Sequence, residues 1–153
     1  MILSCLLAVS VLLAGSNESK NQPGETVRDQ HSIGISLVGG GVCFGGLSLD
    51  AFLNNSFNIE LCGGWGFGGG AKYHWNGADP ACKWSPFIGA YAAIVPEMIL
   101  FSNDSEEWST SIYFPLGVHY ISWSGFSFSI DGGYMNVYGS SHPMASVKVG
   151  WHF

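Results

Sequence analysis

The chain has 153 residues, enough for one domain, and only 10% of them are charged against 47% hydrophobic, where a soluble domain usually has about 25% charged residues. A surface covered with charge is therefore excluded, and the net charge of −6 with five Lys and Arg excludes a nucleic-acid partner, because phosphate binding needs a basic patch. No internal apolar stretch reaches the about 18 residues of a membrane-spanning helix, so the chain could cross a membrane only as a closed β-barrel.

Two N-terminal segments precede the region of regular alternation. Residues 1–16 are nearly all apolar and end in the small residues Ala14-Gly-Ser16, which predicts a secretory signal peptide. No Lys or Arg precedes the apolar run, so the start is either truncated or atypical, and a buried N-terminal helix is the alternative. Residues 17–30 are polar and contain Pro23 and Gly24, which predicts a flexible segment.

From residue 31 onward, apolar residues alternate with polar or small ones, the pattern of strands with one apolar face. We predict eight strands in residues 31–153. The strand in residues 84–95 is ambiguous, because both of its alternating sets are largely apolar or small. The other seven have a clear apolar face, made of Ile33, Ile35 and Leu37; Leu47, Leu49, Ala51 and Leu53; Phe57, Ile59 and Leu61; Ala71, Tyr73 and Trp75; Ile112, Phe114, Leu116, Val118 and Tyr120; Phe126, Phe128 and Ile130; and Ala145, Val147, Val149 and Trp151.

Turn residues predict the connections between these strands. They are Asn54–Ser56, the glycine-rich run Gly63–Gly70, Asn76–Pro80, the acidic loop 96–108, Ser122–Gly125 and the loop Tyr134–Pro143. The connections after the second, fourth and sixth strands are shorter or more turn-like than the loop 96–108. This asymmetry is typical of membrane barrels that keep both termini on the side of the short turns.

The face opposite the apolar one carries most of the charge. Its inward residues include Asp50, Glu60, Lys72, His74, His119, Asp131, Lys148 and His152. We therefore predict a polar lumen. An eight-stranded barrel is just wide enough for side chains to fill, so these groups are expected to close the bore with ion pairs.

Register arguments bring three of these charges together. Direct pairing across the turn after the second strand places Asp50 opposite Glu60, and the register expected for the next hairpin places Glu60 opposite Lys72. Two adjacent carboxylates repel unless a cation bridges them or one takes a proton; Lys72 can bridge them, and Lys148 can reach from across the barrel. A paired-carboxylate hydrolase is disfavoured, because the narrow bore lacks a substrate-sized cleft.

A second group of inward residues invites a nucleophilic interpretation. A three-residue turn at 122–124 would put Ser127 opposite His119, with Ser129 diagonal to it and Asp131 on the same face. A histidine beside a serine can act as a base toward a nucleophile. We favour the alternative, a lumen histidine held by serine hydroxyls, and predict no catalytic residue.

Two further histidines lie close to strand ends. His74 and His152 could approach one another only through closure of the barrel, and no fixed short spacing supports a metal site. The sequence therefore predicts neither a metal nor a cofactor.

Three cysteines remain after removal of the signal peptide, an odd number for an oxidising compartment. Cys43 and Cys62 face opposite sides at the predicted register, so they can form a disulfide only if the glycines around Gly45 and Gly46 break the alternation. Cys82 lies in a turn far from both and is expected to be free.

Aromatic residues gather at one end of the predicted strands, where they would form a girdle at the level of lipid headgroups. They are Phe57, Tyr73, Trp75, Trp84, Tyr120, Trp123, Phe126, Trp151 and Phe153. The final strand, with Trp151 and the terminal Phe153, resembles the last strand of bacterial outer-membrane barrels. The runs 46–53, 70–75 and 113–122 look like short porin-family or uncharacterised barrels of Bacteroidota-type bacteria. Residues 31–153 as a whole resemble the small eight-stranded outer-membrane barrels, similar in architecture to the transmembrane domain of outer-membrane protein A.

This resemblance implies an all-β, eight-stranded antiparallel up-and-down transmembrane barrel in a Gram-negative outer membrane, with both mature termini in the periplasm. It implies contact with outer-membrane lipid and lipopolysaccharide, and recognition by the barrel-assembly machinery through the strand ending in Phe153. The implied role is structural, envelope-maintaining or surface interaction, with the loop 96–108 as a surface for an extracellular partner. The family's fold also hosts other functions, so the role is not fixed by it.

Two rival classes remain. The first is a lipid-modifying membrane enzyme similar to the lipid A deacylases, whose serine and histidine face the lipid, whereas His119 is predicted to face inward. The second is a soluble lipocalin-like barrel, whose interior would be apolar. The faces that carry Lys72 and Lys148 would then lie outside, and a small lumen would have to hold every Trp and Phe.

Overall fold

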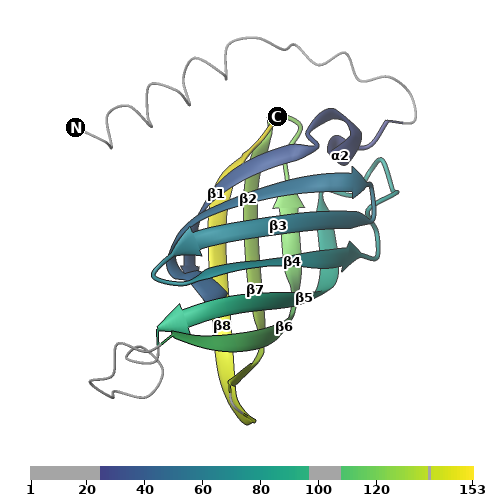
Figure 1. Ribbon diagram of the computed structural model, residues 1–153. Coiled ribbons are helices and arrows are strands. Elements are labelled where there is room, and N and C mark those ends of the chain that lie inside the picture. The colour runs from purple at the N-terminus through teal and green to yellow at the C-terminus, as the bar shows by residue number, and fades with distance from the viewer. Residues whose placement is uncertain (1–24, 97–107, 138) are drawn as a thin grey trace, which may run out of the picture.

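The computed structural model describes residues 25–96, 108–137 and 139–153. Eight antiparallel strands form one sheet that closes on itself, as Figure 1 shows. Within these ranges the strands are accompanied by the short helices α2 (Val27–Gln30) and η1 (Gly41–Cys43). The predicted eight-stranded antiparallel up-and-down barrel is confirmed. The strands are β1 (Ile33–Gly40), β2 (Phe44–Asn54), β3 (Phe57–Gly64), β4 (Phe67–His74), β5 (Trp84–Pro96), β6 (Trp108–Ile121), β7 (Phe126–Val137) and β8 (Ser140–His152).

Within these ranges, no helix is long and apolar enough to cross a membrane. The predicted signal peptide, residues 1–16, lies outside the described residues, as do residues 97–107 of the predicted loop 96–108.

The barrel closes through pairing of β1 with β8. Leu37 lies opposite Val149 and Ile35 opposite Trp151, and the amide of Phe153 donates to the carbonyl of Ile33 (2.7 Å). We call the end at which β1 begins and β8 finishes the terminal end, and the opposite end the η1 end. Closure leaves no free sheet edge, so every strand satisfies its backbone hydrogen bonds within the sheet.

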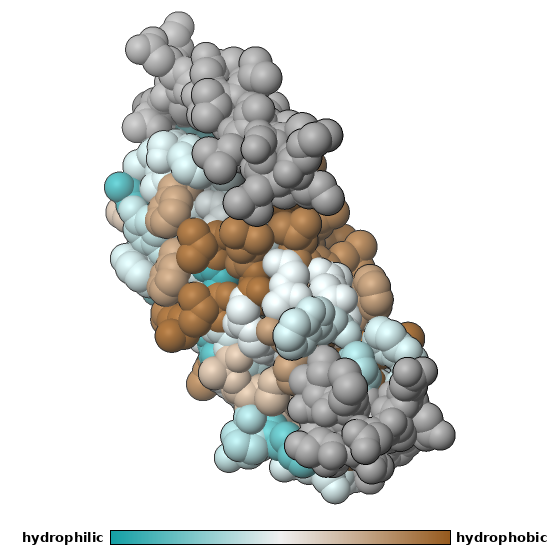
Figure 2. All heavy atoms as spheres, turned by 90° about the vertical axis from the view of Figure 1, so that its left-hand side faces the viewer, coloured by the Kyte–Doolittle hydropathy of each residue, from teal (hydrophilic) through white to brown (hydrophobic). Residues whose placement is uncertain are grey.

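The alternation of the sequence becomes an inside and an outside. On most strands, buried and exposed residues alternate, with the predicted apolar face outward and the charged face inward. Figure 2 shows hydrophobic residues gathered across the middle of one outer face. The facing of β5, which the sequence left open, is set by its neighbours: Phe87, Tyr91 and Val95 point inward, while Ile88 and Ile94 point outward.

Two predicted connections turn out to be largely strand. β3 continues to Gly64 and β4 begins at Phe67, so the glycine-rich run contributes to a hairpin with a two-residue turn. In the same way, β7 and β8 extend over most of the predicted loop Tyr134–Pro143. Among the glycines of β4, Gly70 leaves room for the large inward side chain of Tyr91, which lies opposite it on β5.

The predicted asymmetry of short turns and long loops holds only in part. At the terminal end, the connection between β4 and β5 spans residues 75–83, longer than the two-residue turn between β3 and β4 at the η1 end. The asymmetry therefore rests on the connection between β5 and β6, residues 97–107.

Helix α2 covers the terminal end, where the sequence predicted a flexible segment through residue 30. Val27 is buried in a cluster with Phe52 and Ile121. Two contacts tie the segment to turns of the barrel: Arg28 Nη1 donates to the carbonyl of Gly77 (3.5 Å), and His31 Nε2 donates to that of Trp123 (2.9 Å). Residues 25–30 are thus ordered because they bury apolar surface against the barrel.

The capping box of α2 yields a pH-dependent prediction. Asp29 Oδ2 accepts hydrogen bonds from the amide of Thr26 (2.9 Å) and from Asn55 Nδ2 (3.2 Å). Burial raises the pKa of Asp29, but the hydrogen bonds with Thr26 and Asn55 outweigh it and hold the pKa below its usual range. A depressed pKa means that this stabilisation is present above the unfolded pKa of about 3.9 and is lost as the pH falls through the folded value.

Asp29→Asn is therefore expected to lower the urea midpoint of the terminal-end cap at neutral pH, measured by the fluorescence of the nearby Trp123. The difference from the parent chain should shrink as the pH falls below about 4. A difference that stays constant down to acid pH would show that the carboxylate charge of Asp29 contributes nothing to the cap.

Candidate functional site

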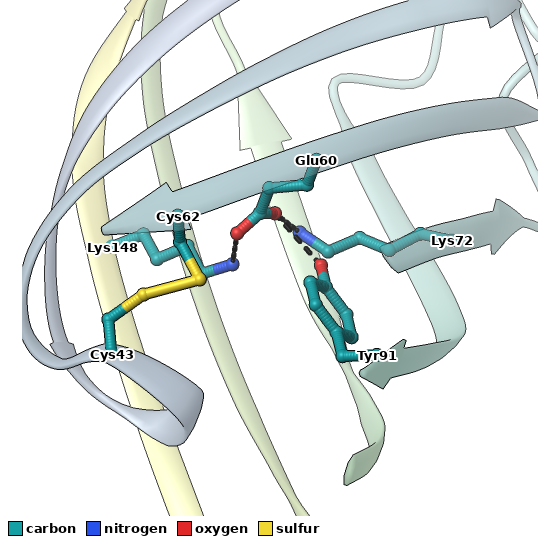
Figure 3. The surroundings of a disulfide bond; sticks show 6 residues. All are labelled: Cys43, Glu60, Cys62, Lys72, Tyr91 and Lys148. Atoms are coloured by element: carbon teal, nitrogen blue, oxygen red, sulfur yellow. Dashed lines mark hydrogen bonds and ion pairs between the residues drawn. A yellow bond between two sulfur atoms is a disulfide. The ribbon is translucent and has the colours of Figure 1, made fainter. Parts of the chain in front are cut away.

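A buried ion-pair group occupies the middle of the bore. Glu60 of β3 is 2% exposed and lies between two lysines, which approach its carboxylate from opposite sides in Figure 3. Lys72 Nζ lies 2.6 Å from Oε2, and Lys148 Nζ of β8 pairs with Oε1. The Tyr91 hydroxyl donates to Oε2 (2.9 Å). One carboxylate therefore joins strands from opposite sides of the barrel.

The registers of this group are partly as the sequence predicts. Asp50 lies opposite Glu60, as expected. Glu60 lies opposite Gly70, however, and Lys72 lies opposite Asn58, so the predicted pairing of Glu60 with Lys72 was wrong by two residues. The tight turn between β3 and β4 sets this register. Lys72 still reaches Glu60, because a long side chain spans the diagonal between neighbouring strands.

The other two inward carboxylates have partners of their own. Asp50 accepts a hydrogen bond from Asn58 Nδ2 (3.3 Å) and lies 3.4 Å from His152 Nε2. Asp131 accepts a hydrogen bond from the Tyr113 hydroxyl (2.7 Å). Asp50 and Glu60, the facing carboxylates, are thus each surrounded by hydrogen-bond donors from several strands. Buried polar groups require such partners.

A glycine makes room for the tyrosine of the ion-pair group. A Cβ on Gly70 of β4 would lie 2.3 Å from the carbonyl oxygen of Ala90 and 2.5 Å from Cγ of Tyr91, which shows that β5 and its tyrosine ring pack directly on the glycine backbone. Gly70→Ala is expected to displace Tyr91 from Glu60 and to lower the free energy of unfolding by about 1–3 kcal/mol, the range for overpacking. Urea unfolding followed by tryptophan fluorescence measures this.

Gly45 of β2 provides the matched control for that prediction. A Cβ there would meet nothing within 4 Å. Gly45→Ala should therefore change the free energy of unfolding by no more than about 0.5 kcal/mol. Equal effects of the two substitutions would show that contact with Tyr91 is not what requires glycine at position 70.

Three histidines form a second layer, nearer the terminal end. The ring centroids of His74, His119 and His152 lie 5.3, 6.2 and 5.8 Å from that of Phe52, and His119 lies 5.6 Å from His74 and 5.4 Å from His152. Closure of the barrel therefore brings His74 and His152 to either side of His119. Phe52 occupies the space among the rings, and among the described residues no three His, Cys, Asp or Glu are arranged to hold a metal ion.

The predicted pairing of His119 with Ser127 was wrong. His119 lies opposite Ser129, and Ser127 lies opposite Ile121. The reason is the length of the turn between β6 and β7, which spans residues 122–125 and is closed by a hydrogen bond from the amide of Gly125 to the carbonyl of Ser122 (2.9 Å). The side chain of Asp131 pairs with Tyr113, so no described contact joins these residues into a nucleophile, base and acid.

The sequence predicts a polar lumen, but part of the bore is apolar. Its η1 end holds a buried apolar cluster of Val38, Val42, Cys43, Cys62, Tyr91, Ala93, Val95, Tyr113, Met135 and Val137. The sequence does not predict this cluster, because the pattern predicts a loop over residues 134–143 and leaves the facing of β5 open. Large apolar residues at the inward positions of β7, namely Met135 and Val137, were the available signal.

A disulfide joins Cys43 of η1 to Cys62 of β3, with Cα atoms 6.2 Å apart. The break in alternation that this pairing requires occurs at Gly40, Gly41 and Phe44, all with positive φ, rather than at Gly45 and Gly46. Cys82 carries a free thiol.

Two small cavities flank the ion pair between Glu60 and Lys148. Each has a volume of about 10 Å³, which is room for about one water molecule. One lies toward the disulfide, and the other lies toward Ser129 and His119. Side chains of the strands line both cavities, in keeping with the narrow bore of eight strands.

The outer surface carries aromatic residues at both ends. At the terminal end, ring contacts link Phe57 to Tyr73 (5.3 Å), Tyr73 to Trp75 (6.0 Å), Trp84 to Tyr120 (4.9 Å) and Phe126 to Trp151 (6.2 Å). Phe153 is also exposed there, whereas Trp123 packs against the cluster beneath α2 and does not join this ring.

A second group of exposed aromatics lies toward the η1 end and was missed from the sequence. It consists of Trp65, Phe67, Trp108 and Tyr134. These residues fall in or beside segments taken as connections, so their outward facing could not be counted. We call the two groups the terminal-end ring and the η1-end group.

No family model matches the sequence, and no curated protein matches it. Among solved structures, the N-terminal β-barrel domain of Pseudomonas aeruginosa OprF is similar, with a TM-score of 0.59 and 19% identity. The alignment covers 80% of this chain and 98% of that one. At this identity, the similarity concerns the fold, a closed barrel of eight antiparallel strands.

Proposed function

We propose that the chain is an integral outer-membrane β-barrel with a closed bore and a structural, envelope-maintaining or surface-interaction role. The observation that carries this proposal is the apolar outer belt between the terminal-end ring and the η1-end group. Its exposed residues include Leu37, Leu49, Leu61, Ile88, Ile94, Ile112, Phe114, Leu116, Ile130, Val147 and Val149. Outer-membrane barrels have such a band, flanked by aromatic residues at both interfaces.

The belt is difficult to reconcile with water as its solvent. Soluble monomers rarely expose contiguous apolar patches larger than a few hundred Å². A lipocalin-like barrel would also need the reverse distribution, yet Glu60, Lys72 and Asp50 are buried while the leucines are exposed. The fold similarity to the OprF barrel domain is in keeping with the proposal.

A non-enzymatic role is favoured by the placement of the polar residues. His119 and Ser129 are buried in the bore, whereas a lipid-modifying enzyme needs its reacting groups on the lipid side. The ion-pair group and the apolar cluster fill the bore, so a large conductance is not expected.

The proposal includes an orientation in the membrane and a set of partners. Both mature termini would lie in the periplasm, after removal of residues 1–16, and lipid and lipopolysaccharide would surround the belt. The barrel-assembly machinery would recognise β8 together with the exposed Phe153. Loop 96–108 would reach the cell surface and offer a site to an extracellular partner. The Bacteroidota-type resemblance stays a prediction.

Reconstitution tests the proposal. The purified full chain, folded from urea in the presence of phospholipid vesicles, should float with the vesicles in a density gradient and resist extraction by alkaline carbonate. The same chain folded without lipid or detergent should aggregate. Recovery of a monodisperse folded protein from plain buffer would contradict the proposal.

A further inference from the structure

We infer that residues Gly40–Phe44, which we call the plug, close the η1 end of the bore, and that the Cys43–Cys62 disulfide is the redox-sensitive lock that holds the plug inside. The inference concerns the interior of the barrel. It does not depend on whether the outer surface faces lipid or water.

The plug lies inside the ring of strands. Helix η1 contacts β3, β4 and β5 as well as β8, although it connects only β1 to β2. Val42 and Cys43 belong to the buried apolar cluster, and Cys43 is 0% exposed. A connection that touches both sides of the bore has folded inward across its mouth, as the disulfide view in Figure 3 also shows for Cys43.

The backbone of the plug turns through three residues with positive φ, a conformation that glycine adopts freely but that strains Phe44. Gly40, Gly41 and Phe44 have φ values of 85°, 59° and 54°, and Phe44 has a side chain in this left-handed region. A Cβ on Gly41 would lie 3.1 Å from Cβ of Ser146, so the turn is also tightly packed. Strained backbone of this kind persists only where surrounding contacts hold it.

The disulfide is the strongest of those contacts. The described backbone hydrogen bonds between this region and the β3–β4 turn are long: the amide of Gly66 to the carbonyl of Cys43, and that of Trp65 to the carbonyl of Gly45, both at 3.4 Å. The covalent bond to Cys62 on β3 holds η1 to the wall. Without it, only non-covalent contacts oppose the strain of the turn: the packing of Val42 and Cys43, the contact of Gly41 with Ser146 and the long hydrogen bond from Gly66.

Release of the plug would expose the ion-pair group from the η1 end. The water-sized cavity between the plug and the ion-pair group is lined by Gly41, Val42 and Cys43 of the plug and by Glu60 and Lys148 of the ion-pair group. Reduction by a dithiol breaks the sulfur–sulfur bond and forms two cysteine thiols. The dithiol supplies two electrons and two protons and becomes a cyclic disulfide, so the step is balanced and reversible.

Thiol labelling in the folded barrel tests the lock. Every variant also carries Cys5→Ser, so Cys62→Ser/Cys82→Ser keeps Cys43 as its single thiol, on the plug itself and without the disulfide. The accessible reference is Cys43→Ser/Cys62→Ser, which keeps only the half-buried Cys82 in the connection between β4 and β5. The buried reference adds Cys82→Ser and Ser129→Cys to that variant, which places one thiol deep in the bore. Each protein is treated with a water-soluble maleimide in detergent micelles.

The inference predicts that Cys43 reacts within about tenfold of the rate of Cys82 while the thiol at position 129 stays protected, because only the plug opens. Protection of Cys43 equal to that at position 129 would overturn the lock. Equal labelling at all three positions would also overturn it, because the disulfide would then hold the whole barrel. If the Cys62→Ser/Cys82→Ser protein does not fold, the folded Cys82→Ser protein is reduced with dithiothreitol and labelled. Labelling of its Cys43 and Cys62 while the thiol at position 129 stays protected supports the lock, and protection of both cysteines overturns it.

Discussion

Lys72→Met is expected to lower the free energy of unfolding by about 3–5 kcal/mol at neutral pH, the cost of removing one partner from a buried ion pair. Lys72 Nζ lies 2.6 Å from Glu60 Oε2, and both side chains are 2% exposed. The loss leaves Glu60, Asp50 and Asp131 in the bore with Lys148 as the remaining lysine of the group. Urea unfolding of the detergent-folded barrel, followed by tryptophan fluorescence, measures the change.

Lys83→Met is the matched control. Lys83 lies in the connection between β4 and β5 and makes no ion pair within the ranges that the structure describes. Its substitution should change the free energy of unfolding by no more than about 0.5 kcal/mol. The double variant Glu60→Gln/Lys72→Met should recover part of the loss of Lys72→Met, because it also removes the unpaired charge. An unchanged midpoint for Lys72→Met would contradict the placement of charge in the bore.

Leu61→Arg is expected to cost about 2–4 kcal/mol in a lipid bilayer, because an arginine on the lipid face is least tolerated at the midplane. Leu61 of β3 is 67% exposed and lies midway between Phe57 of the terminal-end ring and Trp65 of the η1-end group. An exposed leucine in water would tolerate the same change within about 0.5 kcal/mol. The size of the effect therefore reports the solvent around the belt.

Leu53→Arg tests whether the cost of an arginine depends on its depth in the membrane. Leu53 of β2 is 66% exposed, nearly the same fraction as Leu61, but it lies beside the turn at the terminal end. Arginine there should cost about 0–1 kcal/mol, as it does near membrane interfaces. Reversible unfolding in phospholipid vesicles compares the two variants. Equal costs at both positions would argue against a bilayer around the barrel.

The architecture could be predicted because it follows from a period of two. Alternation in β1, β2, β3, β6 and β8 assigned the apolar faces to the outside, and the structure has them there. Where both alternating sets were apolar, as in β5, the sequence held no information on facing. Burial of Phe87 and Tyr91 depends on the neighbouring strands, since Gly117 of β6 lies opposite Phe87 and Gly70 of β4 lies opposite Tyr91.

Registers were harder to predict than faces, because a register depends on the length of each turn. The pairing of Asp50 with Glu60 was correct, since a short turn joins β2 and β3. The predicted partners of Lys72 and His119 were each wrong by two residues. The glycine run predicts a turn but forms strand, and the turn between β6 and β7 has four residues where the sequence predicts three. An error of two residues keeps the face, so Lys72 and Lys148 still meet Glu60 in the bore. The contact of Tyr91 with Glu60 was not predicted, because the facing of β5 was open.

The plug and α2 could not be predicted, since neither follows from alternation. η1 depends on positive φ values at Gly40, Gly41 and Phe44 and on a disulfide that forms only when the loop turns inward. Helix α2 has only four residues, and it is ordered by burial of Val27 against Phe52 and Ile121. Both segments depend on contacts between distant parts of the chain.

Heat modifiability tests the central claim most directly. The full chain is expressed in a Gram-negative host, and its membrane fractions are run on an SDS gel with and without boiling. A closed membrane barrel should appear in the outer-membrane fraction and should change mobility on boiling, because SDS does not unfold it at room temperature. A protein found in the soluble fraction with the same mobility before and after boiling would contradict the account.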